Sequence, residues 1–207
     1  MTNQKDFAIC EPMYLPPVSF LKMLKSYKGL HLEIHEHFKK STYRNRCYLP
    51  SANGIQLLSI PLLKGKNEKI PMNEVGICYR QNWQREHLKT LKVIYRKSPF
   101  FEFYEHELEE IFQQQIPLLV DWNIVLLNFV LQKMNFKTEL KITNDYQEKI
   151  SDADDFRNQF SNLKNENSND ENTIKYHQVF ENKIGFQPNM SVVDLLFAEG
   201  NNAHSFI

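Results

Sequence analysis

The sequence predicts an α/β or α+β fold, in which several helices pack on a mixed β-sheet. Three observations predict it. Runs of β-prone residues alternate with amphipathic segments, the chain opens with a strand, a turn and a helix, and a hairpin signal lies near Gly54. At 207 residues, with 42% hydrophobic and 24% charged residues, the chain has the composition of one soluble globular domain with a sizeable core.

The first thirty residues predict a strand, a rigid turn and a helix. Residues 7–10 (FAIC) form a short apolar run, and residues 11–17 (EPMYLPP) hold three prolines and one carboxylate. Residues 18–27 then place apolar side chains at helical spacing, and Gly29 is a common type of residue at a helix end. Ligands of open α/β sheets bind at the carboxyl ends of strands, where this turn would lie. The turn is therefore the first candidate for a functional segment.

Four further strands are predicted in the next fifty residues. Residues 31–35 alternate between polar and apolar side chains. The β-prone runs at 47–49 and 55–62 are separated by a short segment that ends in Asn53-Gly54, which is a strong hairpin signal. Residues 75–79 form another short apolar run. We expect all of these strands to join one mixed sheet.

The second half of the sequence is mainly helical. Helices are predicted at 83–96, 100–114 and 117–135, followed by a strand at 138–142. Ser191 is a good N-cap for a last helix at 192–198, and Gly200 ends it. Residues 161–173 are almost wholly polar and cannot bury enough apolar area to offset the entropy of ordering. We expect residues 1–207 to form a single domain with a mobile loop at about 161–173.

The composition excludes several classes of function. Lys plus Arg and Asp plus Glu balance at 25 each, so the basic excess of a nucleic-acid-binding protein is absent. Three widely spaced cysteines argue against a disulfide framework or a zinc site. His31, Glu33 and His35 would share a strand face, but no fourth ligand is visible, so we expect no metal. Because the sequence shows neither a signal peptide nor a membrane span, we expect a cytoplasmic protein; its oligomeric state stays open.

Six segments, taken together, resemble the WbqC-like protein family. Their order and spacing match from about residue 8 to residue 201. They are EPMYLP at 11–16, YRNR at 43–46, LSIP at 58–61, WQREH at 83–87, YRKSPFF at 95–101 and PNMSVVDLLF at 188–197. The wording of YRNRC and of YHQVFENKIGFQPN resembles the Bacteroidetes branch. One departure is Cys10-Glu11, where the family turn often carries His-Gln.

The resemblance implies a role in surface-polysaccharide biosynthesis, because the family occurs in O-antigen and related gene clusters. One type of member has been suggested to be an acyl or aminoacyl (glycine) transferase that acts on an amino sugar. The alternative is a non-catalytic protein that binds a nucleotide-sugar or a partner enzyme. The implied substrate is a small molecule, either a nucleotide-sugar or an activated acyl donor, and no cofactor is expected.

Arg46, with Asn45 and Tyr43, is the strongest candidate for substrate binding. A guanidinium group can bind a carboxylate or phosphate through two parallel hydrogen bonds, and Asn and Tyr can add others. The alternative is that Arg46 pairs with Glu11 or Glu36 inside the fold. If the predicted site is right, Glu11 should lie near Arg46.

Glu11 and His87 are the candidates for catalysis, as acceptors of the proton from an attacking amine. Tyr14 and Asp194 are candidates to line the substrate site. Simpler interpretations stay open, because a histidine on an apolar helix face is often a core residue and Asp194 is well placed at a helix start. Cys10 could act as a nucleophile, but after an apolar run it is more typical of a small core residue.

Overall fold

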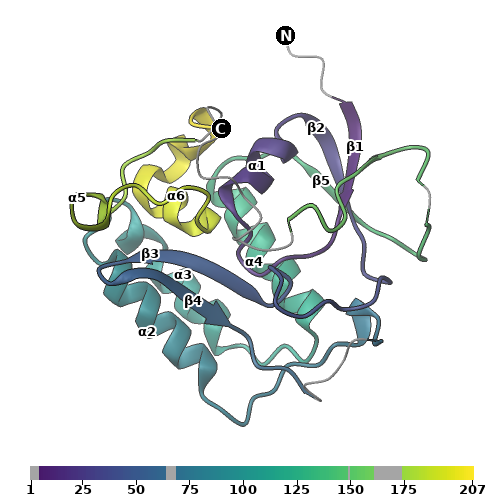
Figure 1. Cartoon of the computed structure of the whole chain (residues 1–207), viewed down its shortest axis with the longest axis horizontal. Helices are drawn as coiled ribbons and strands as arrows, with labels where there is room; N and C mark the ends of the chain where they lie inside the picture. Colours follow the sequence, from purple (N-terminus) through teal and green to yellow (C-terminus); the bar gives the residue numbers. More distant parts are fainter. Residues whose placement is uncertain (1–4, 64–68, 149, 161–173) are drawn as a thin grey trace.

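A four-stranded parallel β-sheet holds the opening strand of the chain in its interior. In this computed structural model, which describes residues 5–63, 69–148, 150–160 and 174–207, the strand order is β5-β2-β1-β6. The strands are β1 (Lys5–Cys10), β2 (Tyr27–Leu32), β5 (Glu139–Ile142) and β6 (Asp154–Asp155), and all neighbours run parallel. The carboxyl ends of these strands therefore lie at one edge of the sheet (Figure 1).

Helix α1 (Val18–Leu24) connects β1 to β2, as predicted, but it ends before Tyr27. Tyr27 begins β2 instead, and Gly29 lies inside that strand, so its prediction as a helix-end residue is wrong. The glycine at this position is explained by the close approach of the Phe7 side chain to its backbone, since a Cβ at position 29 would lie 2.4 Å from Cε1 of Phe7. Glycine lets the aromatic ring of Phe7 on the neighbouring strand lie close over the backbone.

Strand β2 ends at Leu32, so the predicted strand at 31–35 is correct only at its first two residues. The backbone N–H of Glu33 still donates to the carbonyl of Cys10 at 2.9 Å, but Glu33 itself lies beyond the strand. The expectation that His31, Glu33 and His35 share one strand face is therefore wrong.

The predicted hairpin is present as β3 (Arg46–Ser51) and β4 (Gly54–Ser59). The two strands are antiparallel, with Tyr48 opposite Leu57, and Gly54 has the positive φ of 103° that suits glycine in a tight turn. The hairpin forms its own two-stranded sheet, so the expectation that it joins the other strands is wrong. Parallel and antiparallel strands together still give the predicted α/β class.

Two short segments differ from the prediction. Residues 75–79 form no strand in the described chain, and Gly76 and Ile77 make only isolated bridges to Leu118 and Leu62. Conversely, the acidic pair Asp154–Asp155 carries no sequence signal for a strand, yet it pairs with Ala8 and Ile9 of β1. Backbone groups of β1 make this pairing, and it continues past β6, where the backbone N–H of Phe156 donates to the Ile9 carbonyl at 2.9 Å.

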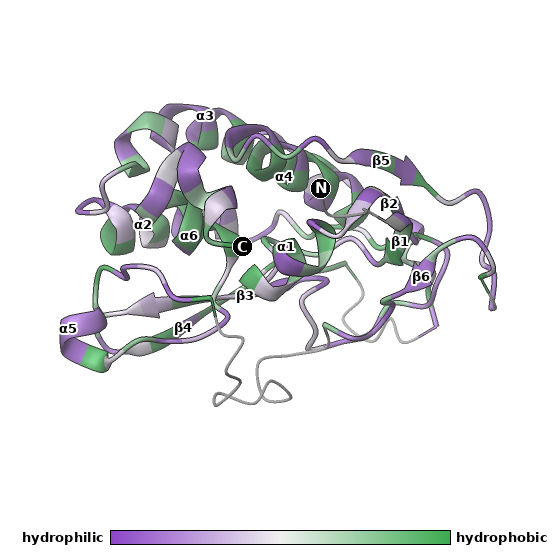
Figure 2. Cartoon of the chain, turned by 90° about the horizontal axis from the view of Figure 1, so that it is seen from above, coloured by the Kyte–Doolittle hydropathy of each residue, from purple (hydrophilic) through white to green (hydrophobic). Residues whose placement is uncertain are grey.

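The predicted helices are confirmed with bounds that differ by a few residues. They are α2 (Trp83–Tyr95), α3 (Phe101–Gln113), α4 (Leu119–Lys133) and α6 (Val192–Glu199); short additional helices are η1 (Met72–Glu74), α5 (Glu181–Ile184) and η3 (Gly200–Ser205). Figure 2 shows α2, α3, α4 and α6 on one side of the hairpin. The hairpin thus has one face toward the helices and one face away from them.

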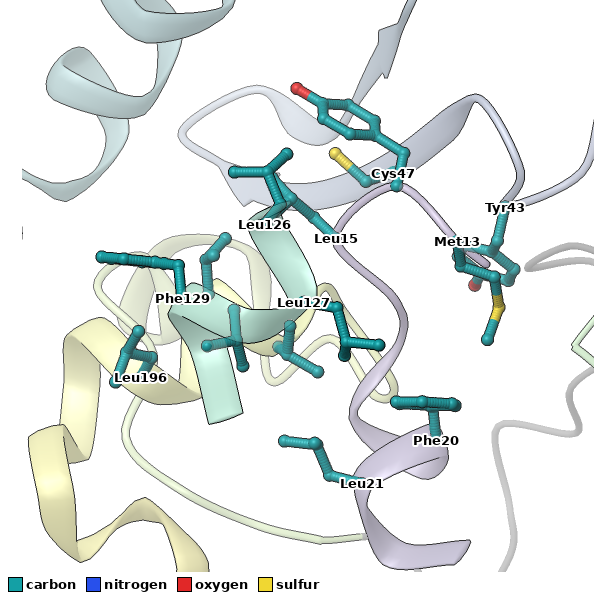
Figure 3. Packing of buried hydrophobic residues seen from close by; sticks show 14 of the residues in the cluster. Met13, Leu15, Phe20, Leu21, Tyr43, Cys47, Leu126, Leu127, Phe129 and Leu196 are labelled. Carbon is teal, nitrogen blue, oxygen red and sulfur yellow. The ribbon is translucent and has the colours of Figure 1, made fainter. Parts of the chain in front are cut away.

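The hydrophobic core joins the opening turn to the hairpin and the helices. In Figure 3, Leu15 of the turn lies beside Cys47 of β3 and Leu126 of α4, and Leu196 of α6 lies on the other side of α4. All four side chains are buried. Leu15 has a φ of 45°, in the left-handed region that a leucine seldom adopts. This backbone conformation is held by the contacts of the surrounding turn.

The opening turn is bonded to distant parts of the chain. Its backbone connects to the segment before β3 and to the start of α6. These bonds are Tyr14 N to Tyr43 O (2.8 Å), Val18 N to Met190 O (2.9 Å), Val192 N to Pro16 O (2.8 Å) and the Ser191 hydroxyl to Leu15 O (3.0 Å). The turn is therefore fixed from several sides.

The predicted mobile loop at about 161–173 lies outside the described residues. Within the part of the chain that the structure describes, no helix is both long and apolar enough to cross a lipid bilayer.

Candidate functional site

The carboxyl edge of the parallel sheet carries polar side chains at the end of every strand. Glu11 follows β1, Glu33 follows β2, Thr143 follows β5, and Arg157 and Asn158 follow β6. The chain leaves β1 for β2 on one side, whereas β6 adds on the other side of β1. Such a reversal of strand order is the place where open α/β sheets bind ligands.

Glu11 forms a buried ion pair with Arg44 rather than with Arg46. Glu11 Oε1 lies 3.2 Å from Arg44 Nη1, and neither side chain is exposed. Arg44 Nε also donates to Glu36 at 3.0 Å, and its Nη2 donates to Asn158 Oδ1 at 2.9 Å. The expected proximity of Glu11 to Arg46 is therefore replaced by a contact with the other arginine of the same YRNR segment. Burial raises the pKa of Glu36, with Arg44 opposing the shift.

A second cluster of charges lies beside this pair. Glu33 accepts hydrogen bonds from the backbone N–H of His35 (2.7 Å) and from the Thr143 hydroxyl (3.2 Å). Its other oxygen lies 3.8 Å from Arg157, which pairs with Asp155 at 2.6 Å. Hydrogen bonding to Arg157 lowers the pKa of Asp155. Glu33 is fully buried, but the Asp155 side chain is 43% exposed and reaches solvent.

Together the two clusters place four carboxylates against two guanidinium groups. The carboxylates belong to Glu11, Glu33, Glu36 and Asp155, and the guanidinium groups to Arg44 and Arg157. When all are ionised, negative charge is in excess among these described residues, even though Lys39 adds a positive charge close enough to act on Glu36. Such an excess attracts a positively charged group, such as an ammonium. We call these six residues the carboxylate cluster.

Tyr14 and His87, both predicted as site residues, are brought into direct contact. The Tyr14 hydroxyl lies 2.9 Å from His87 Nδ1, and both side chains are buried. Burial lowers the pKa of His87 to about 4, while a hydrogen bond to the Ser59 carbonyl opposes the shift. His87 is consequently neutral near pH 7. The ring of Trp83 packs edge-on against the ring of His87, and the centroids of these two rings are 5.1 Å apart.

Tyr43, Asn45 and Arg46, predicted to bind substrate together, lie at the start of the hairpin and each has different neighbours. Asn45 donates to the Ile60 carbonyl at 3.1 Å. The ring of Tyr43 packs edge-on against Tyr48, with centroids 5.5 Å apart. Arg46 begins β3 and takes no part in the ion pairs of the carboxylate cluster. Asn45 and Tyr43 thus support the hairpin and its junction with the opening turn.

Asp194 lies in a buried network of its own. The Tyr176 hydroxyl and the Gln178 amide donate to Asp194 Oδ2 at 2.6 and 2.7 Å. Burial raises the pKa of Asp194 to about 6, with these donors opposing the shift. The Ser191 side chain caps α6, as predicted, by accepting from the backbone N–H of Val193. In this structure Asp194 joins α6 to the segment before α5.

Cys10 behaves as a small core residue. Its thiol is buried and lies 3.5 Å from Glu11 Oε2. Burial and the neighbouring Glu11 raise the pKa of the Cys10 thiol well above its usual range. A thiol in this state is a poor nucleophile, so the packing interpretation is the better one.

Sequence reasoning missed most of the carboxylate cluster. Arg44 stands in the YRNR segment and Glu36 is an alternative partner for Arg46, but no motif marks Arg157 or distinguishes Arg44 from Arg46, because charged residues are usually exposed. Within the described residues, no group of three or more His, Cys, Asp or Glu side chains is arranged to hold a metal ion. A cavity of about 160 Å³ lies at the opposite edge, between the end of α1 and the start of β5, and is lined by residues such as Leu24, Phe136 and Thr138. It is separate from the cluster.

A protein-family model matches about three quarters of the chain. The model of the WbqC-like protein family matches residues 11–166, from the Glu11 turn to beyond β6. No curated protein and no solved structure matches the chain in the corresponding comparisons. Membership of this family is compatible with an association with polysaccharide biosynthesis. Because the match covers well over half of the sequence, the chain belongs to the WbqC-like protein family.

Proposed function

We propose that the protein is a transferase of surface-polysaccharide biosynthesis that moves an acyl or aminoacyl group, such as glycyl, to the amine of an amino sugar. The excess of carboxylates at the carboxyl edge is the observation that carries this proposal. An amino sugar bears an ammonium at neutral pH, and carboxylates are its natural partners. We place the reaction in the cytoplasm, where activated acyl donors and nucleotide-sugars are made.

The chemistry requires that the ammonium first lose a proton. The free amine then attacks the acyl carbon, an amide bond forms, the bond from that carbon to the leaving group breaks, and the second proton of the amine passes to the departing group. Asp155 is the member of the carboxylate cluster that a ligand can reach from solvent. Glu11 and His87, the catalytic candidates of the sequence analysis, are the proposed proton acceptors.

A second candidate function is binding without turnover. It is favoured by the way in which Glu11 and His87 are held, because each is buried and already paired, with Arg44 and Tyr14 respectively. A group saturated by partners is a poor proton acceptor until those partners move. In this case the protein would present a nucleotide-sugar to a partner enzyme.

The test compares amino sugars with their N-acetylated forms. Purified protein is incubated with activated acyl and aminoacyl donors, and amide products are detected by mass spectrometry. We expect product and a thermal shift with the free amine only. Asp155→Asn should weaken amino-sugar binding about tenfold, whereas Asp152→Asn, an exposed carboxylate nearby, should not.

Each outcome has a different meaning. A thermal shift with the free amine but without product supports the second candidate. Equal binding of amino and N-acetylated sugars would contradict recognition of an ammonium by the carboxylate cluster. It would therefore contradict both the proposed transferase and the second candidate, binding without turnover.

A further inference from the structure

Arg46 is an arginine without a partner in the described part of the chain. Its side chain forms no ion pair or hydrogen bond there, whereas Arg44 and Arg157 each bind a carboxylate. The Nε–H of Arg46 is shielded from solvent and has no acceptor. Because a guanidinium keeps its charge at every physiological pH, Arg46 leaves a positive charge available at the base of the hairpin.

Tyr48 lies on the same face of β3 as Arg46. Side chains alternate along a strand, and Cys47 and Leu49 between and beyond them are buried on the opposite face. Tyr48 is half-buried, and its ring is held edge-on by Tyr43. A ring fixed in this way keeps a surface for stacking at little further cost in entropy.

Strand β4 adds a hydroxyl and an apolar side chain opposite these two residues. Ser59 pairs with Arg46 and Leu57 pairs with Tyr48 in the hairpin register. Ser59 is exposed, and Leu57 is 40% exposed. We call Arg46, Tyr48, Leu57 and Ser59 the hairpin face. It combines an unpaired cation and a hydroxyl at one end with an aromatic and an aliphatic surface at the other.

We infer that the hairpin face binds a nucleoside diphosphate. The Arg46 guanidinium and the Ser59 hydroxyl donate to phosphate oxygens, and the base lies against Tyr48 and Leu57. This inference rests on the proposed function, since it assigns a place to the nucleotide part of a nucleotide-sugar. It assigns the negatively charged diphosphate to the hairpin face and the positively charged amine to the carboxylate cluster. Separate residues therefore recognise the two charged groups of a nucleotide-linked amino sugar.

The experiment is calorimetric titration of the full chain with UDP, ADP and GDP, and with inorganic pyrophosphate. At least one nucleoside diphosphate should bind more tightly than pyrophosphate. Arg46→Gln should weaken that binding about 10- to 100-fold. Tyr48→Ala should weaken the nucleotide and leave pyrophosphate unchanged. Arg96→Gln, which removes an exposed arginine after α2, is the matched control and should have no effect.

The inference is overturned if no nucleoside diphosphate binds at millimolar concentration, or if Arg46→Gln binds as tightly as the unaltered chain. Circular dichroism checks the fold of each variant. Should Arg46→Gln fail to fold, Arg46→Lys keeps the charge but loses the planar fork, and it should still weaken binding severalfold. Loss of nucleotide binding with intact amino-sugar binding contradicts this inference alone, whereas nucleotide binding without any amide product contradicts only the proposed transferase.

Discussion

The Glu11 carboxylate lies 3.2 Å from the Arg44 guanidinium, and neither side chain has any exposed surface. This ion pair joins the end of the first strand to the segment that precedes the hairpin. Removing charges from water is costly, so the pair is stable only while both partners and their hydrogen bonds are present. The carboxyl edge of the sheet is therefore sensitive to the loss of a single charge.

Glu11→Gln should lower the free energy of unfolding by roughly 3 kcal/mol, because it leaves the buried Arg44 charge with Glu36 as its remaining carboxylate. Urea denaturation followed by circular dichroism measures the change. Asp6→Asn is the control, since Asp6 pairs with Lys28 at 2.7 Å on the exposed surface and should change stability very little. Equal effects of the two substitutions would contradict a buried ion pair.

Tyr14→Phe should lower the free energy of unfolding by about 1–2 kcal/mol, because the buried Nδ1 of His87 would lose its hydrogen-bond partner. Urea denaturation measures the change. Tyr146→Phe removes a hydroxyl from a half-exposed tyrosine and serves as the control. If both variants are as stable as the parent, the hydroxyl does not stabilise His87.

His87 and Asp194 should have opposite effects on stability as the pH falls. Burial lowers the pKa of His87 from 6.5 to about 4, so the folded state favours the neutral ring and stability is lost across that range. Burial raises the pKa of Asp194 from 3.8 to about 6, so the folded state favours the protonated acid and stability is gained between those values. Each effect amounts to roughly 3 kcal/mol at its limit and largely cancels the other.

Two variants separate these effects. Relative to the unaltered chain, Asp194→Asn should become less stable as the pH is lowered from 7 to 4, and His87→Asn should become more stable. Urea denaturation at each pH gives the difference in free energy. Parallel curves for all three proteins would show that neither group titrates with a shifted pKa.

Gly29→Ala should destabilise the fold by about 1–3 kcal/mol, because the added Cβ would lie 2.4 Å from the Phe7 ring. Thermal denaturation measures the loss. The double variant with Phe7→Ala removes the ring and should recover part of the stability lost through the methyl group. An additive loss in the double variant would mean that the ring does not cause the effect.

The sequence predicts those elements best whose signals are local. Helices α2, α3, α4 and α6 follow from apolar periodicity and from the Ser191 cap, and the hairpin follows from Asn53-Gly54. Strand β6 could not be predicted, because Asp154 and Asp155 pair with a strand nearly 150 residues away. Local propensity carries no information on such a pairing.

The candidate site was predicted in part, and the choice between two arginines shows why. Arg44 and Arg46 stand in one short segment and have the same chemistry. Strand β3 begins at Arg46, so this residue belongs to the hairpin. Arg44 lies before the strand, and its side chain binds Glu11 at the carboxyl end of β1. The direction of each side chain thus depends on a strand boundary, which is the least certain feature of any prediction from sequence.

The bonds between the opening turn and residues 190–192 also determine when the protein can fold. Ser191 and Leu15 are 176 positions apart, so a ribosome makes the turn long before the residues that hold it. Contacts of such long range form slowly, and until then the apolar side chains of the turn and of α1 are open to solvent. A nascent chain that stops before Ser191 would therefore be prone to aggregate, and the fold is completed only when α6 has been made.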